Sequence, residues 1–376
     1  TPHMPPDQPK LPDETLAVIR KWIADGAPLN ADSKPQKTAA AQQPAAPHPP
    51  ITHAPSETPM PDAAPRTLAP APPRPVAATA IAASPAAPLV AVCGAEQIAL
   101  YHDNSGELLA ALPFPEGRIE RLQFSPDGLW LLAAGGQPER SGRVVIFDVR
   151  SGERLFEIGR MYDVVLAAAC DPFRELVAYG GSNRVVRVFD TLTGKTAYEL
   201  RKHNEWITSL AFSPDATLLA TADRAGGLFV WEALTGRFVF ELRGHDGAIH
   251  ALAFSPDSQT LLSAGDDGVV RMWNMDDGRK IRQFNAHAGA VLSIDVAPDG
   301  RLVTSGADRR VKLWEPGGKA MRTLPELEDW AYSAAFSSDA ARVYAGDWCG
   351  NVEVFDCGDG ERKRRFTTTP AAPQSN

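Results

Sequence analysis

The chain contains the run Val269-Val-Arg-Met-Trp273, in which apolar residues alternate with others until an aromatic residue closes the run. A similar run, Val311-Lys-Leu-Trp314, ends one interval later. Over the whole chain, aromatic residues close such runs at nearly equal intervals, usually before an acid, at Tyr101, Phe147, Phe189, Trp231, Trp273, Trp314 and Phe355. A fixed period of about 40–45 residues that holds several short strands is typical of a propeller of four-stranded blades. The sequence therefore predicts an all-β fold with seven blades.

Each unit can be read as four strands separated by turns. The first strand ends in a turn such as Phe124-Ser-Pro-Asp-Gly128, where Pro presets φ and Asp or Gly completes the turn. The second strand is short and apolar, the third closes on the aromatic residue, and the fourth follows a Gly turn. The units run from Val76 to about Thr368, and we expect residues 76–368 to be the propeller domain. In the weak first unit, the expected strands are residues 76–83, 89–93, 97–101 and 107–112.

The sequence outside the repeats has a different composition. Residues 1–30 contain one expected helix, whose apolar face includes Trp22. Residues 31–75 are rich in Ala, Pro, Gln, Ser and Thr, and proline makes up nearly a third of the stretch from Pro35 to Pro75. So few apolar side chains predict a disordered Pro/Ala-rich linker. We expect residues 369–376 to be a disordered tail.

The ring can close in two ways. If every unit is counted from its first strand to its fourth, the first and last units each supply all four strands of their own blade. Closure then rests on side-chain packing between blades one and seven. Alternatively, residues Arg66–Leu68 supply an outer strand to the last blade. The first way is preferred, because each sheet of a stacked ring must cover the face of the next.

Composition and charge limit the function classes. The 376 residues carry a formal net charge of −8, which gives no support to nucleic-acid binding, because that calls for a strong basic excess. No apolar run approaches the ~18–20 residues of a transmembrane helix. The four scattered cysteines form neither a disulfide framework nor a Cys-x-x-Cys-His run, so we expect no cofactor in this chain. The basic run Arg362–Arg365 falls on the last outer strand, where charge prevents edge-to-edge pairing; the alternative is contact with an acidic lipid or polymer. We expect a monomeric propeller.

The residues inside the repeats resemble those of the WD-repeat propellers, whose best units begin with Gly-His and end with Trp-Asp. In that family an Asp holds a His, the His bonds a hydroxyl, and the hydroxyl accepts from the indole N–H of a Trp. Each buried polar group thereby finds a partner. Two units carry the whole tetrad, and a third lacks the acid because Ala225 stands in its place. The residues implied by the resemblance are His245, Ser263, Asp267 and Trp273, then His287, Thr304, Asp308 and Trp314, and finally His203, Thr221 and Trp231.

The three tetrad histidines stand at equal intervals along the chain, which could suggest a symmetric metal site. Equivalent positions on adjacent blades are separated by a sheet-packing distance of ~10 Å or more, whereas zinc needs its nitrogen ligands within ~2.1 Å. The spacing therefore favours structural histidines.

The opening segment Thr1-Pro-His-Met-Pro-Pro-Asp7 and the helix after it resemble the last stretch of a planctomycete-type cytochrome c domain. Such domains are often joined by a linker to a WD-repeat propeller. The resemblance implies that Met4 is the thioether axial ligand of a haem c iron in a longer parent protein, whose attachment cysteines lie upstream. It also implies a periplasmic or cell-envelope location, because haem is attached outside the bacterial cytoplasmic membrane. The alternative is that Met4 is a solvated residue in a proline-rich tail.

The WD-repeat resemblance implies that the loops from fourth to first strands and from second to third strands share one face. Trp206 and Trp330 hold the same repeat position, immediately before a first strand, and Trp348 lies in a second-to-third strand turn. Exposed aromatic residues are enriched at interface hot spots, so we expect these three to bind a partner. The alternative is that they pack locally over blade ends. The expected polar surround consists of Arg224, Asp266, Arg309 and Arg310.

Three functions compete at this stage. The leading hypothesis is a non-catalytic scaffold that binds a protein or peptide on the loop-bearing face. The second is electron transfer by an upstream haem domain for which Met4 supplies a ligand. The third is a propeller enzyme, which requires acids, histidines or metal ligands to converge on the central channel. The first strands contain only Glu120, His250 and Asp295 of these types, so the sequence predicts no enzyme.

Overall fold

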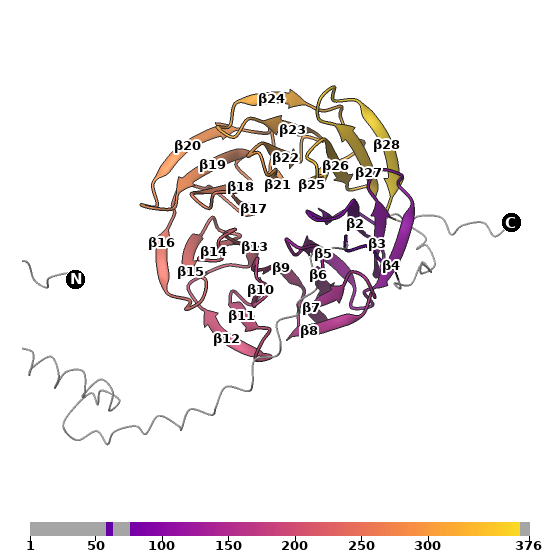
Figure 1. The fold of residues 1–376 in the computed structure, drawn as a ribbon. Coiled ribbons are helices and arrows are strands. Elements are labelled where there is room, and N and C mark those ends of the chain that lie inside the picture. The colour runs from indigo at the N-terminus through magenta and orange to yellow at the C-terminus, as the bar shows by residue number, and fades with distance from the viewer. Residues whose placement is uncertain (1–57, 63–75, 369–376) are drawn as a thin grey trace, which may run out of the picture. The chain divides into compact units, whose positions relative to one another are not determined.

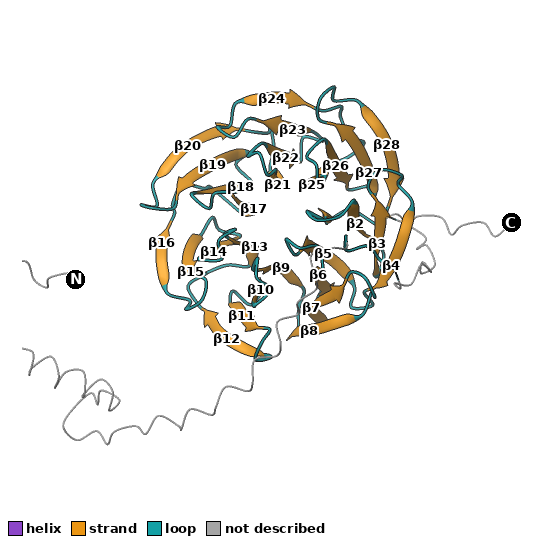
Figure 2. Cartoon of the chain, viewed as in Figure 1, coloured by secondary structure: helices purple, strands orange, loops and turns teal. Residues whose placement is uncertain are grey.

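Each repeat folds into a four-stranded antiparallel sheet, and the seven sheets stand side by side around a common centre (Figure 1). The structure is a computed structural model that describes residues 58–62 and 76–368. The first strand of each sheet lies nearest the centre and the fourth lies on the rim (Figure 1). Strands, turns and loops make up the described residues, which contain no helix (Figure 2). The prediction of an all-β, seven-bladed propeller is confirmed.

The strands follow one another in sequence order within every blade. Blades 1 to 3 consist of β1 (Ile81–Ala83), β2 (Leu89–Cys93), β3 (Gln97–His102), β4 (Leu108–Pro113), β5 (Arg118–Phe124), β6 (Trp130–Gln137), β7 (Ser141–Asp148), β8 (Arg154–Met161), β9 (Val165–Cys170), β10 (Leu176–Gly181), β11 (Val186–Asp190) and β12 (Lys195–Leu200). Blades 4 and 5 consist of β13 (Ile207–Phe212), β14 (Leu218–Asp223), β15 (Leu228–Glu232), β16 (Phe238–Glu241), β17 (Ile249–Phe254), β18 (Thr260–Gly265), β19 (Val269–Asn274) and β20 (Lys280–Asn285). Blades 6 and 7 consist of β21 (Val291–Val296), β22 (Leu302–Gly306), β23 (Val311–Trp314), β24 (Ala320–Thr323), β25 (Ala331–Phe336), β26 (Arg342–Asp347), β27 (Asn351–Asp356) and β28 (Arg362–Thr367).

The hydrophobic core lies between the blades rather than inside any one of them. Seven clusters of buried side chains occur among the described residues, and each joins one blade to the next around the ring. The second strands show why, because both of their faces are covered: all five residues of β2 are buried. The fourth strands form the rim (Figure 1), and two of them, β20 and β24, are almost entirely exposed. A blade therefore has no core of its own and depends on both neighbours.

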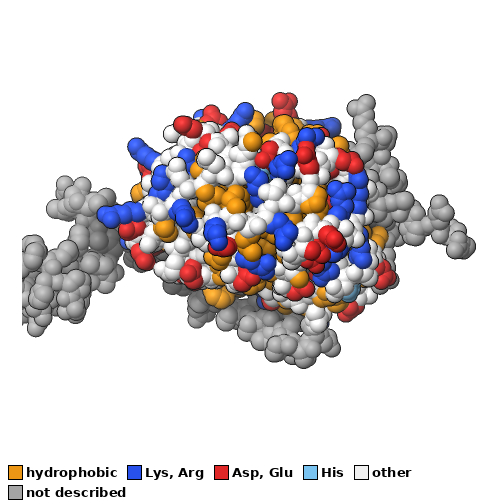
Figure 3. Space-filling view, turned by 90° about the horizontal axis from the view of Figure 1, so that it is seen from above, with side chains coloured by type: hydrophobic (Ala, Val, Ile, Leu, Met, Phe, Trp, Pro, Cys, Tyr) orange, Lys and Arg blue, Asp and Glu red, His pale blue; other side chains and the backbone are white. Residues whose placement is uncertain are grey.

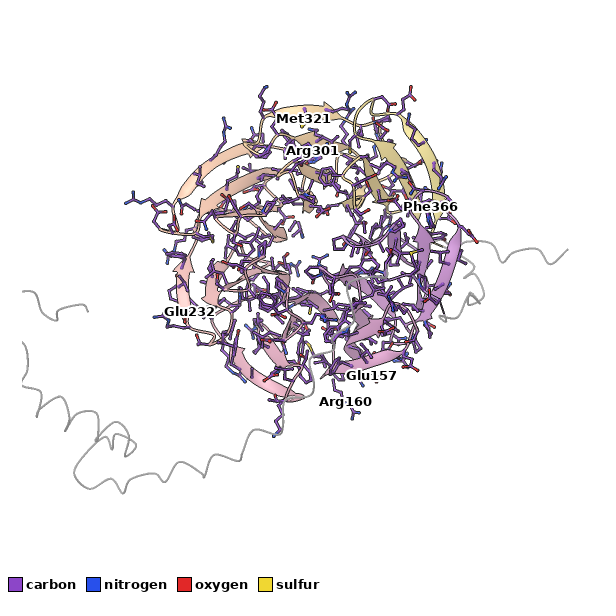
Figure 4. The ribbon with its side chains drawn as sticks, in the orientation of Figure 1. Glu157, Arg160, Glu232, Arg301, Met321 and Phe366 are labelled. Atoms are coloured by element: carbon purple, nitrogen blue, oxygen red, sulfur yellow. The ribbon has the colours of Figure 1, made fainter. Side chains whose placement is uncertain are left out.

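The ring closes by packing between blades 1 and 7, as the preferred prediction states. One of the seven clusters joins residues of blade 1, among them Val92 and Tyr101, to Tyr344 and Val354 of blade 7. The Tyr101 ring stacks on Phe366, with centroids 5.0 Å apart and an interplanar angle of 13°; Figure 4 marks Phe366 beside β4. The sheet of blade 7 contains β25 to β28 only, and the alternative strand Arg66–Leu68 lies outside the described residues.

The first strand of blade 1 is shorter than the sequence predicts, and the residues before it bond to blade 7 as well as to Cys93 of β2. The Ala78 N–H donates to Asp347 O (3.0 Å), and Ser333 Oγ donates to Ala78 O (2.8 Å). Thr368 Oγ1 donates to Val76 O (2.6 Å). Residues 76–80 therefore take part in the closure. The strand register with β2 covers Ile81–Ala83, and the Cys93 N–H of β2 also donates to Ala80 O (3.1 Å).

A polar clamp also holds blades 1 and 7 together. The Asp103 carboxylate, which is buried, accepts hydrogen bonds from the Tyr344 hydroxyl and from Arg342 Nη2 (3.2 Å). Arg342 Nη2 also donates to Asn104 Oδ1 (2.8 Å). Burial raises the pKa of Asp103, and the Arg342 charge acts in the opposite direction. Since a buried carboxylate without partners is costly, the clamp makes blade 1 depend on blade 7.

Charged side chains of both signs lie along the rim of the ring (Figure 3). Figure 3 views the rim from the side of β24 and shows basic and acidic side chains interspersed, with smaller hydrophobic patches between them. On β28, the basic run is tied into its surroundings: Arg362 Nε lies 3.1 Å from Glu353 Oε2, and Arg365 Nη1 donates to Glu328 Oε1 (2.8 Å). Charged outer strands resist pairing with another sheet edge, and this run lies on an outer strand as predicted.

The expected helix of residues 1–30, the Met4 ligand and the tail 369–376 lie outside the described residues. Within the expected linker, residues 58–62 are described, with Pro59 and Pro61 buried. No helix in the described part of the chain is long and apolar enough to span a membrane.

The clamp predicts that Tyr344→Phe lowers the free energy of unfolding by about 1.5–3 kcal/mol, because the variant removes a hydrogen bond to a buried charged group. Equilibrium urea unfolding measures the change. Tyr162→Phe is the control. The Tyr162 side chain is 78% exposed, so removal of its hydroxyl should leave the free energy of unfolding unchanged. Equal stability of Tyr344→Phe and wild type would show that the clamp contributes nothing to closure.

Candidate functional site

Two sets of loops meet on one face of the ring. The Arg224 N–H donates to Trp206 O (2.9 Å), which joins the turn after a second strand to the residue just before a first strand. The equivalent bonds in the last three blades run from Asp266 to Ala248 (2.9 Å), from Ala307 to Ala290 (2.9 Å) and from Trp348 to Trp330 (3.1 Å). We call this side the loop face. The opposite side, the turn face, carries turns such as residues 125–129 and 149–153.

The tetrads of blades 5 and 6 are complete as predicted. In blade 5, His245 Nδ1 lies 3.1 Å from Asp267 Oδ2 and Nε2 lies 2.8 Å from Ser263 Oγ, which also accepts the Trp273 indole N–H (2.8 Å). The corresponding distances in blade 6, among His287, Asp308, Thr304 and Trp314, are 2.7, 2.8 and 2.9 Å. Each histidine is thus engaged at both nitrogens inside its own blade, which leaves neither nitrogen for a shared metal ion.

Blade 4 also has a complete tetrad, so the prediction that its acid is missing is wrong. Asp223 Oδ2 lies 2.8 Å from His203 Nδ1, and His203 Nε2 lies 2.7 Å from Thr221 Oγ1. The Trp231 indole N–H donates to the same hydroxyl (2.9 Å). Ala225 occupies the position of the usual acid, and Asp223 replaces it from two residues earlier in the chain.

The displaced acid has a steric explanation. Asp223 is the last residue of β14, at the position held by Gly265 and Gly306 in the next two blades. A Cβ at Gly306 would lie 2.6 Å from His287 Cγ, so blade 6 has no room for a side chain there and takes its acid from the turn. Burial acts to raise the pKa of Asp223, but the hydrogen bonds from His203 and the Gly227 N–H outweigh it and hold that pKa below its usual range.

Blade 5 adds a cation to its tetrad. Arg271 Nη1 donates to Asp267 Oδ2 (2.6 Å) and lies 2.8 Å from His245 Nδ1. Burial, followed by the Arg271 charge, lowers the pKa of His245 to about 4. The imidazole is therefore neutral near pH 7, and its two nitrogens contact Asp267 and the Ser263 hydroxyl. The pKa of His287 is lowered as well, mainly by burial.

The three tryptophans predicted to bind a partner are all exposed on the loop face, at 41% for Trp206, 51% for Trp330 and 45% for Trp348. They divide into two places. Trp206 lies on blade 4, with the Arg224 guanidinium 5.0 Å from its ring centroid. Trp330 and Trp348 lie on blade 7, and the Trp348 ring is 5.6 Å from the Tyr332 ring at an angle of 37°. The sequence reading missed Tyr332, whose position in a first strand gave no sign of this contact.

The rest of the predicted polar surround is also on the loop face but is already paired. Asp266 Oδ1 lies 2.7 Å from His250 Nε2. Arg309 and Arg310 both pair with Glu326, the latter at 3.4 Å. These pairs give the face a polar character. Of the three exposed tryptophans, blade 7 carries two and blade 4 carries one.

The central channel is a cavity of about 470 Å³ lined by the first strands. Those strands have register shifts at their loop-face ends, which leave Thr208 and His250 without partners in the second strand. A bulged residue has a carbonyl that is free of the ladder. Arg121 Nη2 donates to Thr208 O (2.9 Å) and to His250 O (3.1 Å), so a side chain of blade 2 reaches blades 4 and 5.

Arg121 was missed by the sequence reading, which searched the first strands for acids and histidines only. A charged residue in a channel-lining strand was the available signal. Burial lowers the pKa of Arg121, and the neighbouring Glu120 acts in the opposite direction. The three bonds of its guanidinium go to backbone carbonyls, the third being Glu120 O (3.2 Å), so Arg121 ties blades together across the channel.

The three residues weighed as a catalytic set all line the central channel, and each bonds to a neighbour outside the set. Glu120 accepts from Arg118 Nε (2.6 Å), and His250 pairs with Asp266. Asp295 accepts from the N–H groups of Val296 (2.9 Å) and Phe336 (2.8 Å), and burial raises its pKa to about 6. Residues 58–62 and 76–368 contain no cluster of three His, Cys, Asp or Glu side chains that could hold a metal ion.

The family model of the WD domain, G-beta repeat, matches residues 194–232, 236–274 and 278–315. Each match starts at the fourth strand of one blade, continues through the third strand of the next, and includes one complete tetrad. This chain carries WD40 repeats. No curated protein matches it. WD40 propellers are generally non-catalytic and commonly act as protein-interaction scaffolds.

The neutral His245 makes the WD40 propeller sensitive to acid. Between about pH 6.5 and 4, the unfolded chain binds a proton at this residue that the folded protein does not, so stability falls as the pH falls through this window. Lowering the pH from 6.5 to 5 should cost roughly 1.5 kcal/mol through His245.

Urea unfolding of wild type and His245→Gln at pH 7, 6 and 5 measures this term. The difference between the two proteins is the quantity to follow, because Asp295, with its raised pKa, contributes a slope of opposite sign. The stability gap between wild type and variant should shrink toward pH 5. A gap that stays constant would mean that His245 does not titrate as described.

Proposed function

We propose that this WD40 propeller is a non-catalytic scaffold that binds a protein partner on its loop face, with blade 7 as the anchoring contact. The observation that carries the proposal is the exposed pair Trp330 and Trp348, which a backbone hydrogen bond of 3.1 Å holds side by side. Aromatic side chains that are half exposed and fixed by the fold bury much area on binding at a small cost in entropy.

The charge around this pair favours a basic partner. Carboxylates lie near Cys349, which follows Trp348 in the chain. Burial raises the pKa of the Cys349 thiol, and the carboxylates of Asp347, Asp329 and Glu328 raise it further. Asp329 forms no ion pair with any basic side chain among the described residues. Aromatic faces beside an uncompensated negative charge attract a guanidinium or ammonium group.

Blade 4 supplies the internal comparison. There the exposed Trp206 already has a cation, because the Arg224 guanidinium lies over its ring at 5.0 Å. Trp330 and Trp348 have no such contact within the described part of the chain. Trp348 stands in blade 7 where Arg224 stands in blade 4, and we infer that an arginine or lysine of the partner packs on the exposed rings of Trp330 and Trp348.

Electron transfer by an upstream haem c domain stays a prediction for a longer parent protein, as do the periplasmic location and the monomeric state. Met4, the one residue of this chain assigned to haem, lies outside the described residues. A parent sequence that carries a Cys-x-x-Cys-His run before Thr1 would support that prediction.

Selection of a random-peptide display library on the full chain tests the binding proposal. The selected peptides should be enriched in arginine or lysine, and Trp330→Ala/Trp348→Ala should weaken their binding by about 2 kcal/mol or more, the size of a hot-spot loss. The melting temperature should stay unchanged, because both side chains are exposed by about half.

Trp206→Ala is the matched control, since it removes an exposed tryptophan from the same repeat position in blade 4. It should leave peptide binding unchanged. Loss of binding in the control but not in the double variant would move the site to blade 4. Unfolding of the double variant would show that the pair serves packing.

A further inference from the structure

A short segment of the expected linker packs against the propeller. In Thr58-Pro-Met-Pro-Asp62, Pro59 and Pro61 are buried, and Met60 packs against the hydrophobic cluster shared by blades 1 and 2. The Met60 N–H donates to Thr58 O (2.9 Å), which bends the segment tightly. Buried prolines within a Pro/Ala-rich stretch indicate a specific contact, because an unattached linker would leave them in water.

The contact lies where two turns of the turn face meet. A Cβ at Gly128, in the turn of blade 2, would lie 2.8 Å from Ser84 Oγ, 2.9 Å from Pro59 Cγ and 3.1 Å from Ala86 Cβ. Ser84 and Ala86 belong to the turn between β1 and β2, in blade 1. Pro59 therefore closes over the junction of blades 1 and 2, on the side opposite the tryptophans.

The turn of blade 1 departs from its repeat at this point. In the other Ser-initiated turns, the serine hydroxyl donates to a carboxylate two residues later; these pairs are Ser125 with Asp127, Ser213 with Asp215, Ser255 with Asp257, and Ser337 with Asp339. Ala86 holds the corresponding position in blade 1. The missing carboxylate leaves no charge beside the buried Ser84 and Gly128, so the Pro59 ring lies against this junction without desolvating an acid.

We propose that the junction of blades 1 and 2 on the turn face is a docking groove for the chain's own segment 58–62. Proline rings are rigid, so binding them costs little conformational entropy. The flexible Met60 side chain fills irregular space beside them. Only the short stretch 63–75 separates the segment from Val76. The effective concentration of the tethered segment is therefore of millimolar order, and even a weak contact is occupied.

The docked segment lies on the turn face, and the loop face with Trp330 and Trp348 stays open to a partner. The groove does not depend on the proposed function, because it would hold the linker whatever the loop face binds.

Methionine oxidation of the full chain by dilute peroxide, followed by mass spectrometry, tests the groove. Met321, labelled on the outer rim in Figure 4 and 47% exposed, is the internal reference. In wild type, Met60 should oxidise about five-fold more slowly than Met321, since oxidation follows exposure. Ala86→Asp restores the acid of the other turns, places a charge against Pro59, and should raise the Met60 rate to that of Met321.

Ala341→Asp is the matched control, because Ala341 is exposed in the corresponding turn of blade 7. It should leave Met60 protected. If Ala86→Asp proves unstable, Pro59→Ala/Pro61→Ala releases the segment without changing the propeller, and Met60 should again oxidise rapidly. Rapid oxidation of Met60 in wild type, or equal protection in all variants, overturns the proposal. So does protection of Met4, in the related run Thr1-Pro-His-Met-Pro-Pro-Asp7, in place of Met60.

Discussion

Burial of every sheet face against the next sheet is the constraint on which the rest of this structure depends. The seven hydrophobic clusters of the described residues all lie between blades, so no blade has a complete core until its two neighbours are in place. A linear stack of such sheets would leave an apolar face at each end, and closing the ring removes both ends. The contacts between blades 1 and 7 are therefore as necessary as any within the repeat. In this chain, the Tyr101–Phe366 stack and the Asp103 clamp are among the contacts that join blades 1 and 7.

The sequence was a good guide wherever information repeats along the chain. The regular aromatic positions predicted the number of blades and the third strands, and the Ser-Pro-Asp turns marked the ends of the first strands. The tetrads of blades 5 and 6 followed from family spacing. The same spacing did not identify Asp223 as the acid of the blade 4 tetrad. Blade 6 has a glycine at this strand end because a side chain would collide with the histidine, whereas in blade 4 the Asp223 carboxylate reaches His203 from there. The Asp103–Tyr344 bond had no sequence signal, since its partners are far apart in the chain and neither belongs to a repeated pattern.

The candidate site was predicted in part. Composition and repeat position were enough to place Trp206, Trp330 and Trp348 on the loop face. They could not separate blade 4, where the Arg224 guanidinium already lies over the tryptophan, from blade 7. There Tyr332 packs on Trp348, and the neighbouring Asp329 has no ion pair among the described residues. That distinction depends on side chains that approach through the fold. Arg121 is a similar case: its guanidinium meets carbonyls that are free only because the first strands are bulged.

Native-state hydrogen exchange tests most directly whether the ring is closed and cooperative. The measurement compares second strands at the junction, β2 and β26, with second strands far from it, β14 and β18. A closed ring predicts that the slowest amides of all four strands exchange with the same free energy, equal to that of global unfolding. Exchange of β2 and β26 at a clearly lower free energy, while β14 and β18 stay protected, would show an open stack with frayed ends and would contradict this account.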